Sequence, residues 1–235
     1  MWTITEMKER GKAAFKANYW PSVLCAFLLM LLAGGTSVSI NATKQQPEYS
    51  TEDINNMMNG MTPEQQLATA GIFTGVVLVI IAVAVVLQIF LFNPLNVGCI
   101  GFFKENVKSG GQGDLGVIKS GFQSYGRTFL TMFLKDLFLV LWTLLFIIPG
   151  FIKAYSYRMV PYIIRDNPEL SPTEVITRSR EMMNGHKLNT FLLDLSFIGW
   201  IILGSITCGL VQIFWTGPYM SNTNAALYLR LSQQA

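Results

Sequence analysis

The chain has 235 residues, of which 51% are hydrophobic and 13% are charged, and its formal net charge is +3. Together with a mean hydropathy of +0.40, this composition argues against a fully water-exposed surface and is typical of an integral membrane protein. The simplest prediction is one all-α membrane domain over residues 1–235, a polytopic helical bundle.

Residues 1–19 carry Glu6 and Glu9 as well as four lysine or arginine residues. This stretch is too long and too mixed in charge for the basic start of a signal peptide, so we expect it to be retained. It is predicted to form a cytoplasmic amphipathic helix over residues 3–17. The first predicted membrane segment follows at residues 20–40.

The connection at residues 41–69 is acidic, rich in methionine and predicted to be extracytoplasmic. Met57, Met58 and Met61 could bind a soft cation, but this spacing more often forms one face of a short surface helix. The second membrane segment, residues 70–93, is the clearest. Gly71 to Phe92 carry no charge, and such a helix is about 33 Å long, enough to cross a hydrocarbon core of about 30 Å.

The connection at residues 94–127 contains a glycine-rich stretch, and no Gly-Lys-Ser/Thr follows it, which favours a linker over a phosphate-binding loop. An amphipathic helix is predicted at 114–126, within a cytoplasmic connection over 104–127. Apolar segments follow at 128–148 and 150–165, the second being short for a full crossing. Pro149 and Gly150 leave almost no loop between them, which predicts a tight antiparallel hairpin.

The next cytoplasmic connection, residues 165–187, contains the best-specified helix, at 172–184. Ser171 is placed to cap it, Pro172 opens it, Glu174 completes a capping box, and Gly185 ends it. Its apolar residues share one face, so we expect it to lie in the membrane interface with its basic groups near anionic headgroups. The last two membrane segments, residues 188–207 and 209–229, turn at Cys208 and Gly209.

The predicted architecture is therefore six membrane segments arranged as three hairpins, each preceded by an amphipathic interfacial helix. The N-terminal segment and the two long basic connections carry four lysine or arginine residues each, and the C-terminal tail carries Arg230. The 41–69 connection carries only Lys44. Because cytoplasmic loops are enriched in lysine and arginine, both termini are predicted to be cytoplasmic.

Four charged residues lie inside the predicted membrane segments: Lys135, Asp136, Arg158 and Asp194. Helix geometry puts them at similar depth, near the cytoplasmic side, where acids and bases can pair. Such residues are candidates for a functional polar network, although a structural role in holding the bundle together is the favoured interpretation. We predict that Asp194 pairs with Lys135 or Arg158.

Pro149, Gly150 and Lys153 form a second candidate feature. A broken helix at membrane depth can line a binding site, but here the break falls where the topology already needs a turn, which favours a plain hairpin. Lys153 is predicted to lie one turn from the outer end, where it could reach lipid headgroups.

Three stretches carry a family resemblance: IPGFIKAYSYRMVPYIIRDNPELSPTEVITRSREMMNGHK, FLLDLSFIGWIILGSITCGL and TGPYMSNTNAALY. They resemble the bacterial integral membrane proteins grouped as domain of unknown function 975, most specifically between Ile148 and Tyr228. The resemblance extends over essentially the whole chain. It implies a polytopic plasma-membrane protein, mainly of Gram-positive bacteria, and it implies no activity.

Enzyme chemistry is not predicted, because His186 is the only histidine and neither a multi-histidine metal site nor an HExxH motif can form. Cys25, Cys99 and Cys208 are predicted to be small buried residues without a metal or cofactor. Two functions remain open: a non-enzymatic module that binds membrane lipids or partner membrane proteins, and a transporter or channel that uses the charged layer. The first is favoured, and no nucleic acid partner is expected.

Overall fold

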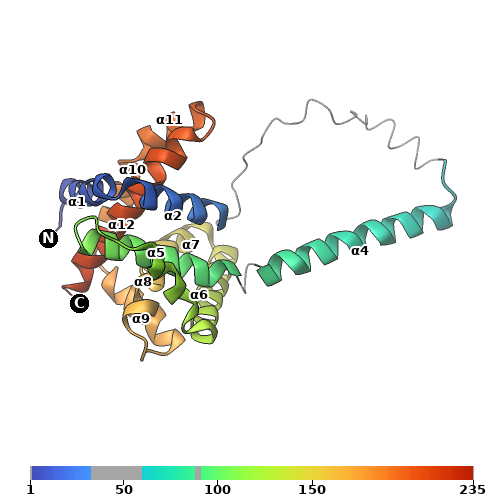
Figure 1. Cartoon of the computed structure of the whole chain (residues 1–235). Helices are drawn as coiled ribbons and strands as arrows, with labels where there is room; N and C mark the ends of the chain where they lie inside the picture. The colour runs from blue at the N-terminus through green and yellow to red at the C-terminus, as the bar shows by residue number, and fades with distance from the viewer. Residues whose placement is uncertain (1, 33–59, 88–90, 235) are drawn as a thin grey trace. The chain divides into compact units, whose positions relative to one another are not determined.

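The computed structural model describes residues 2–32, 60–87 and 91–234 (Figure 1). Within these residues the secondary structure is helical and contains no strand, as predicted. The contacts divide the chain into two compact units, one made of Met1–Thr36 with Ile89–Ala235 and the other of Ser37–Gln88. The single membrane domain expected from the sequence stays a prediction.

The smaller unit contains the helix α4 (Pro63–Leu87), which corresponds to the segment predicted at 70–93. It begins earlier because Thr62 and Gln65 cap it reciprocally: the Thr62 N–H donates to Gln65 Oε1 at 3.0 Å, and the Gln65 N–H donates to Thr62 Oγ1 at 3.4 Å. Pro63–Val83 is long and apolar enough to cross a membrane. Met57 and Met58, from the predicted surface helix, lie outside the described residues, whereas Met61 lies just before α4 and its Sδ accepts from Thr69 Oγ1 at 3.9 Å.

At the core of the larger unit lies α12 (Gly217–Ser232), with α1 (Ile4–Ala17), α2 (Tyr19–Leu32) and α5 (Asn93–Lys108) packed around it (Figure 1). The sequence assigned residues 209–229 to a membrane span, and this segment is not among the candidate spans of the described residues. A π-helical turn, η3 (Gln212–Thr216), interrupts the segment, and most of α12 is buried within the protein. Apolar composition suits a protein core as well as a bilayer, so hydropathy does not separate the two.

Helix α1 confirms the helix predicted at 3–17, but its apolar face is covered by protein. Met7 and Phe15 are fully buried, and Gly11 lies directly against Thr223 of α12. A Cβ atom at Gly11 would stand 2.5 Å from Thr223 Oγ1, so glycine is needed for this approach.

Helix α5 occupies residues that the sequence assigned to a connection. Phe102 and Phe103 are buried, and Asn106 is fully buried in a cluster of hydrogen bonds. Asn106 Nδ2 donates to Asn222 Oδ1 of α12 at 2.9 Å, and Asn18 Nδ2 donates to Asn106 Oδ1 at 2.8 Å. The cytoplasmic connection predicted from residue 104 therefore begins inside a core helix. The helix predicted at 114–126 is present in part, as the 3₁₀ helix η2 (Leu115–Phe122).

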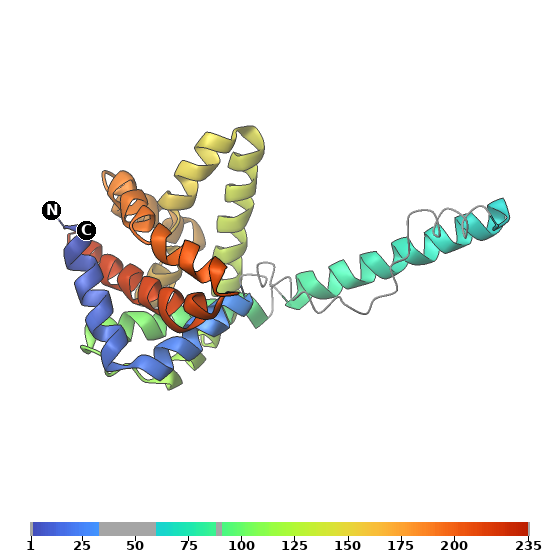
Figure 2. The same ribbon diagram turned by 90° about the horizontal axis from the view of Figure 1, so that it is seen from above.

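The segments predicted at 128–148 and 150–165 are α6 (Tyr125–Leu145), α7 (Ile147–Ser156) and α8 (Val160–Asp166). Helices α6 and α7 pack side by side (Figure 2). The chain turns at Phe146, whose backbone is extended (φ −156°, ψ 134°), rather than at Pro149 and Gly150. The segment predicted at 150–165 is not one helix. Pro161 lacks the backbone N–H that would continue α7, and it instead lies in the first turn of α8.

Helix α9 (Pro172–Met182) carries the predicted capping box: Glu174 N–H donates to Ser171 Oγ, and Ser171 N–H donates to Glu174 Oε2 at 2.7 Å. The predicted placement of its apolar face is wrong. Val175, Ile176 and Met182 are buried against α6 and α8. That face is covered by protein and is not free to enter a membrane interface.

Residues 188–207 form α10 (Lys187–Leu195) and α11 (Ile198–Ile206), and the predicted turn lies at Cys208 (φ 51°) and Gly209 (φ 87°). Among the described residues, three candidate spans satisfy length and apolarity: Pro63–Val83, Tyr125–Leu145 and Lys187–Ile206. A fourth would require α1 and α2, bent by 109°, to act as one span. Six membrane segments in three hairpins are not confirmed.

Candidate functional site

Arg158 and Asp194 form the central ion pair of the predicted polar network. Arg158, just after α7, donates from Nη1 to Asp194 Oδ2 at 2.5 Å and from Nη2 to Asp194 Oδ1 at 2.7 Å. Tyr155 Oη donates to the same carboxylate at 3.0 Å, and Arg158 Nη2 also donates to Asn224 Oδ1 of α12 at 2.8 Å. The pair therefore connects α7, α10 and α12. Both carboxylate oxygens of Asp194 and both Nη atoms of Arg158 have hydrogen-bond partners.

Lys135 and Asp136 are not part of this cluster. Lys135 Nζ lies 2.9 Å from Asp136 Oδ1, its neighbour in α6, and the Asp136 side chain is 51% exposed. Of the two partners that the sequence allowed for Asp194, the structure selects Arg158. The four charged residues form two separate pairs instead of one network.

Pro149, Gly150 and Lys153 all lie on α7, within the helix that follows the turn. Gly150 packs against α6, where a Cβ atom would stand 2.5 Å from Thr143 Oγ1. Lys153 Nζ stacks over the Trp142 ring of α6, 4.6 Å from its centroid. The predicted reach of Lys153 to the outer headgroups stays a prediction, and the structure shows this side chain lining a hollow together with residues of α9 and the start of α10.

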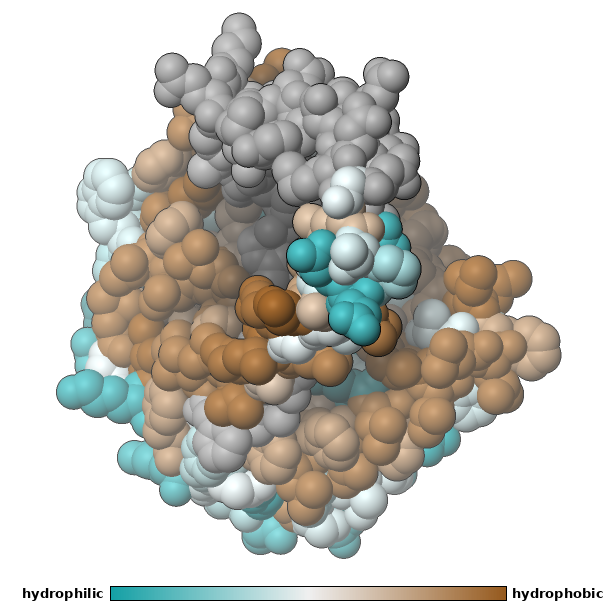
Figure 3. Space-filling view, turned by 90° about the vertical axis from the view of Figure 1, so that its right-hand side faces the viewer, coloured by the Kyte–Doolittle hydropathy of each residue, from teal (hydrophilic) through white to brown (hydrophobic). Residues whose placement is uncertain are grey.

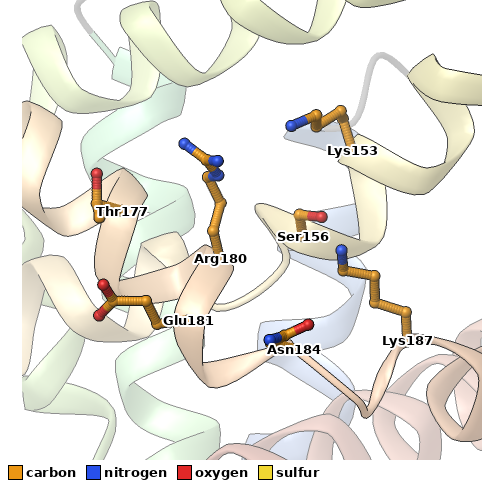
Figure 4. A pocket seen from close by; sticks show the side chains of 7 residues that line it. All are labelled: Lys153, Ser156, Thr177, Arg180, Glu181, Asn184 and Lys187. Atoms are coloured by element: carbon orange, nitrogen blue, oxygen red, sulfur yellow. The ribbon is translucent and has the colours of Figure 1, made fainter.

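A hollow of about 320 Å³ lies between α7, α9 and the start of α10 (Figure 4). Three cations line it: Lys153, Arg180 and Lys187. Figure 4 shows Arg180 extending from α9 toward Lys153, and Lys187 extending toward Ser156. The remaining lining residues are Ser156, Thr177, Glu181 and Asn184. Of these residues the sequence pointed only to Lys153 as a candidate, because the hollow forms where three separate parts of the chain meet.

Arg127 makes a structural contact that the sequence did not predict, because this residue entered only the count of positive charges. Arg127 Nη1 donates to the carbonyl oxygens of Asn167 at 2.7 Å and Leu170 at 2.8 Å, and Nη2 donates to that of Ile164. The guanidinium thus satisfies carbonyl groups at the C-terminal end of α8. The signal available in the sequence was the position of Arg127 at the start of an apolar helix.

No group of three or more histidine, cysteine or acidic residues is positioned to hold a metal ion in the described parts of the chain. His186 Nδ1 accepts a hydrogen bond from Trp2 Nε1 at 3.3 Å. Cys25 and Cys99 are buried, as predicted, whereas Cys208 is exposed, contrary to the prediction.

Comparison with known proteins gives one family match. No curated protein and no solved structure matches the chain. The matched region contains Arg158, Asp194 and all residues that line the basic hollow, and it covers less of the chain than the resemblance suggested. Residues 132–235 match the family described as Protein of unknown function (DUF975), which confirms over this region the family resemblance predicted from the sequence.

Proposed function

We propose that the protein is a non-enzymatic, multi-pass module of a bacterial plasma membrane that binds lipids or partner membrane proteins. The observation that carries this proposal is the apolar surface at the turn between α6 and α7. Its five consecutive residues are between 65% and 80% exposed: Leu144, Leu145, Phe146, Ile147 and Ile148. Soluble monomers rarely expose so continuous an apolar surface, whereas lipid acyl chains would cover it at no cost.

Exposed apolar side chains on other helices also favour a lipid environment. Hydrophobic side chains gather on the face seen in Figure 3. On α2, Trp20 is 70% exposed, and on α11 Ile206 is 73% exposed. Helix α4, taken by itself, exposes apolar side chains along its length. These surfaces favour a protein surrounded by lipid or by other membrane helices.

The arrangement of the charged residues favours a binding module over a transporter. A transport path needs ionisable groups that can change partners as the substrate or ion moves. Here the Asp194 carboxylate accepts from Arg158 and Tyr155, and Arg158 also donates to Asn224, so the cluster is occupied by contacts within the protein. Lys135 and Asp136 pair separately. The contacts of Arg158 with Asp194 and Asn224 therefore favour a structural role in holding helices together.

Reconstitution tests the proposal. Protein in vesicles should resist extraction by alkaline carbonate, and the vesicles should hold potassium and proton gradients as well as protein-free vesicles do. Release by carbonate would overturn integral membrane insertion. A protein-dependent flux that Asp194→Asn abolishes would support the transporter instead. The proposed orientation, with both termini cytoplasmic, rests on the lysine and arginine distribution.

A further inference from the structure

The hollow between α7, α9 and α10 concentrates positive charge. Lys153, Arg180 and Lys187 lie close enough for Arg180 and Lys187 to repel the Lys153 ammonium electrostatically. In the described residues, none of these three cations forms a salt bridge with a carboxylate, since the ion pairs there involve other side chains. Like charges that face one hollow are destabilising, and an anion placed between them would reverse the sign of the interaction.

Glu181 also lines this hollow, but Figure 4 shows its carboxylate directed away from Lys153, on the side of Thr177. Its position leaves the space between Lys153, Arg180 and Lys187 predominantly positive. Asn184 lies at the same edge and offers an amide that can donate hydrogen bonds.

The types of donor in the hollow fit a phosphate group. A guanidinium presents a planar fork that can bind two phosphate oxygens at once, and lysine ammonium groups act as adjustable point charges beside it. The volume of about 320 Å³ exceeds what a bare phosphate needs, so a larger headgroup can enter.

The helices that carry Lys153 and Lys187 also expose apolar side chains, which favours a ligand that has both a phosphate and acyl chains. Phe151 and Ile152 precede Lys153 on α7 and are 55% and 47% exposed, and Leu188 follows Lys187 on α10 and is 69% exposed. Water would leave these side chains unfavourably exposed, whereas acyl chains would cover them.

We propose that Lys153, Arg180 and Lys187 form a binding site for the phosphate of an anionic membrane lipid. This inference rests on the proposed membrane function and adds to it a location and a ligand class. The site lies inside the family-matched region but does not include the Arg158 and Asp194 pair.

The test is lipid retention by the detergent-solubilised full chain, measured by native mass spectrometry during titration with dioleoyl phosphatidylglycerol. The test variant is Lys153→Gln/Arg180→Gln/Lys187→Gln. The matched control, Lys12→Gln/Lys16→Gln/Lys108→Gln, removes the same charge from exposed positions outside the hollow. Dioleoyl phosphatidylcholine and inorganic phosphate serve as the comparison ligands.

We expect the test variant to bind phosphatidylglycerol about tenfold more weakly, the loss of roughly one charge-assisted contact or more, while the control binds like the natural sequence. Inorganic phosphate should not displace the lipid, and phosphatidylcholine should bind more weakly. Arg180→Lys should retain part of the affinity because it keeps the charge.

Equal binding by the test and control variants would overturn the site while leaving the proposed lipid-binding function intact. Displacement by inorganic phosphate at similar concentration would identify a soluble-anion site and overturn the lipid assignment. Failure of the unaltered chain to retain any lipid, together with extraction by carbonate, would overturn the proposed function itself. Unfolding temperatures of all variants establish that lost binding does not reflect lost folding.

Discussion

Arg158 and Asp194 are 36 residues apart in the chain and meet through two hydrogen bonds of 2.5 and 2.7 Å. Their side chains keep 19% and 21% of their surface exposed, so each is mostly removed from solvent. A two-pronged contact of this kind fixes the relative position of α7 and α10 as well as neutralising both charges. Arg158 and Asp194 can be substituted singly or together, so the contribution of the pair to stability can be measured.

Removing one member of this pair should destabilise the protein more than removing both. Asp194→Asn leaves the Arg158 guanidinium without its counter-charge and should cost about 3 kcal/mol of unfolding free energy. Arg158→Gln/Asp194→Asn should recover part of that loss. Lys135→Gln/Asp194→Asn is the control and should recover nothing, because Lys135 pairs with Asp136. Thermal unfolding in detergent micelles measures all three, and a silent Asp194→Asn would mean that the pair does not stabilise the fold.

The close contact of α6 with α7 should depend on Gly150. In Gly150→Ala the new methyl group would lie 2.5 Å from Thr143 Oγ1 and 2.8 Å from Thr143 Cα, so the helices must separate, at a cost of about 1–3 kcal/mol. Gly199→Ala on α11 is the matched control, because no heavy atom lies within 4 Å of its Cβ position. It should be neutral or slightly stabilising, since alanine favours a helix. Equal unfolding temperatures for the two variants would contradict this packing.

The start of α9 should respond to acid through Glu174. Hydrogen bonds with the Ser171 side chain and backbone hold the pKa of Glu174 below its ordinary value of 4.5. Because the folded-state pKa is the lower one, the carboxylate's contribution is complete above the unfolded-state pKa and is lost as pH falls through the folded-state pKa. Hydrogen exchange, corrected for intrinsic rates, should show weaker protection of α9 in acid. In Glu174→Gln that pH dependence should be absent.

The other half of the capping box can be tested at neutral pH. Ser171→Ala removes the hydroxyl that accepts from Glu174 N–H and should cost about 1 kcal/mol of local stability. Thr177→Ala, at an exposed position of the same helix, should leave exchange of the first turn unchanged. If both variants exchange like the natural sequence, packing of the buried face holds α9 without help from its cap.

Membrane orientation should be visible by labelling across α4. Cysteines are placed at Glu64, in the first turn of α4, and at Ser109, which follows α5, in a variant that lacks Cys25, Cys99 and Cys208. An impermeant maleimide should label position 64 in intact cells and position 109 only after permeabilisation, as the lysine and arginine distribution predicts. Labelling of both positions from outside would contradict a membrane crossing by α4.

The sequence by itself determined the helical class, the strongest apolar helix and the local structure of α9. A capping box needs only residues that lie three positions apart, so Ser171 and Glu174 predicted the start of α9. A run of uncharged residues likewise predicted α4. Opposite charges inside apolar segments limited the partners of Asp194 to two, although they did not choose between Arg158 and Lys135.

Only the tertiary structure decided which apolar surfaces meet protein. Hydropathy is the same for a side chain that faces lipid and for one that faces another helix, so the buried positions of α5, α9 and α12 were not distinguishable from membrane-facing ones. The contact of Gly150 with Thr143 and the convergence of Lys153, Arg180 and Lys187 depend on how separate helices pack. Spacing along one helix carries no information about such contacts, because they are fixed by the shapes of neighbouring surfaces.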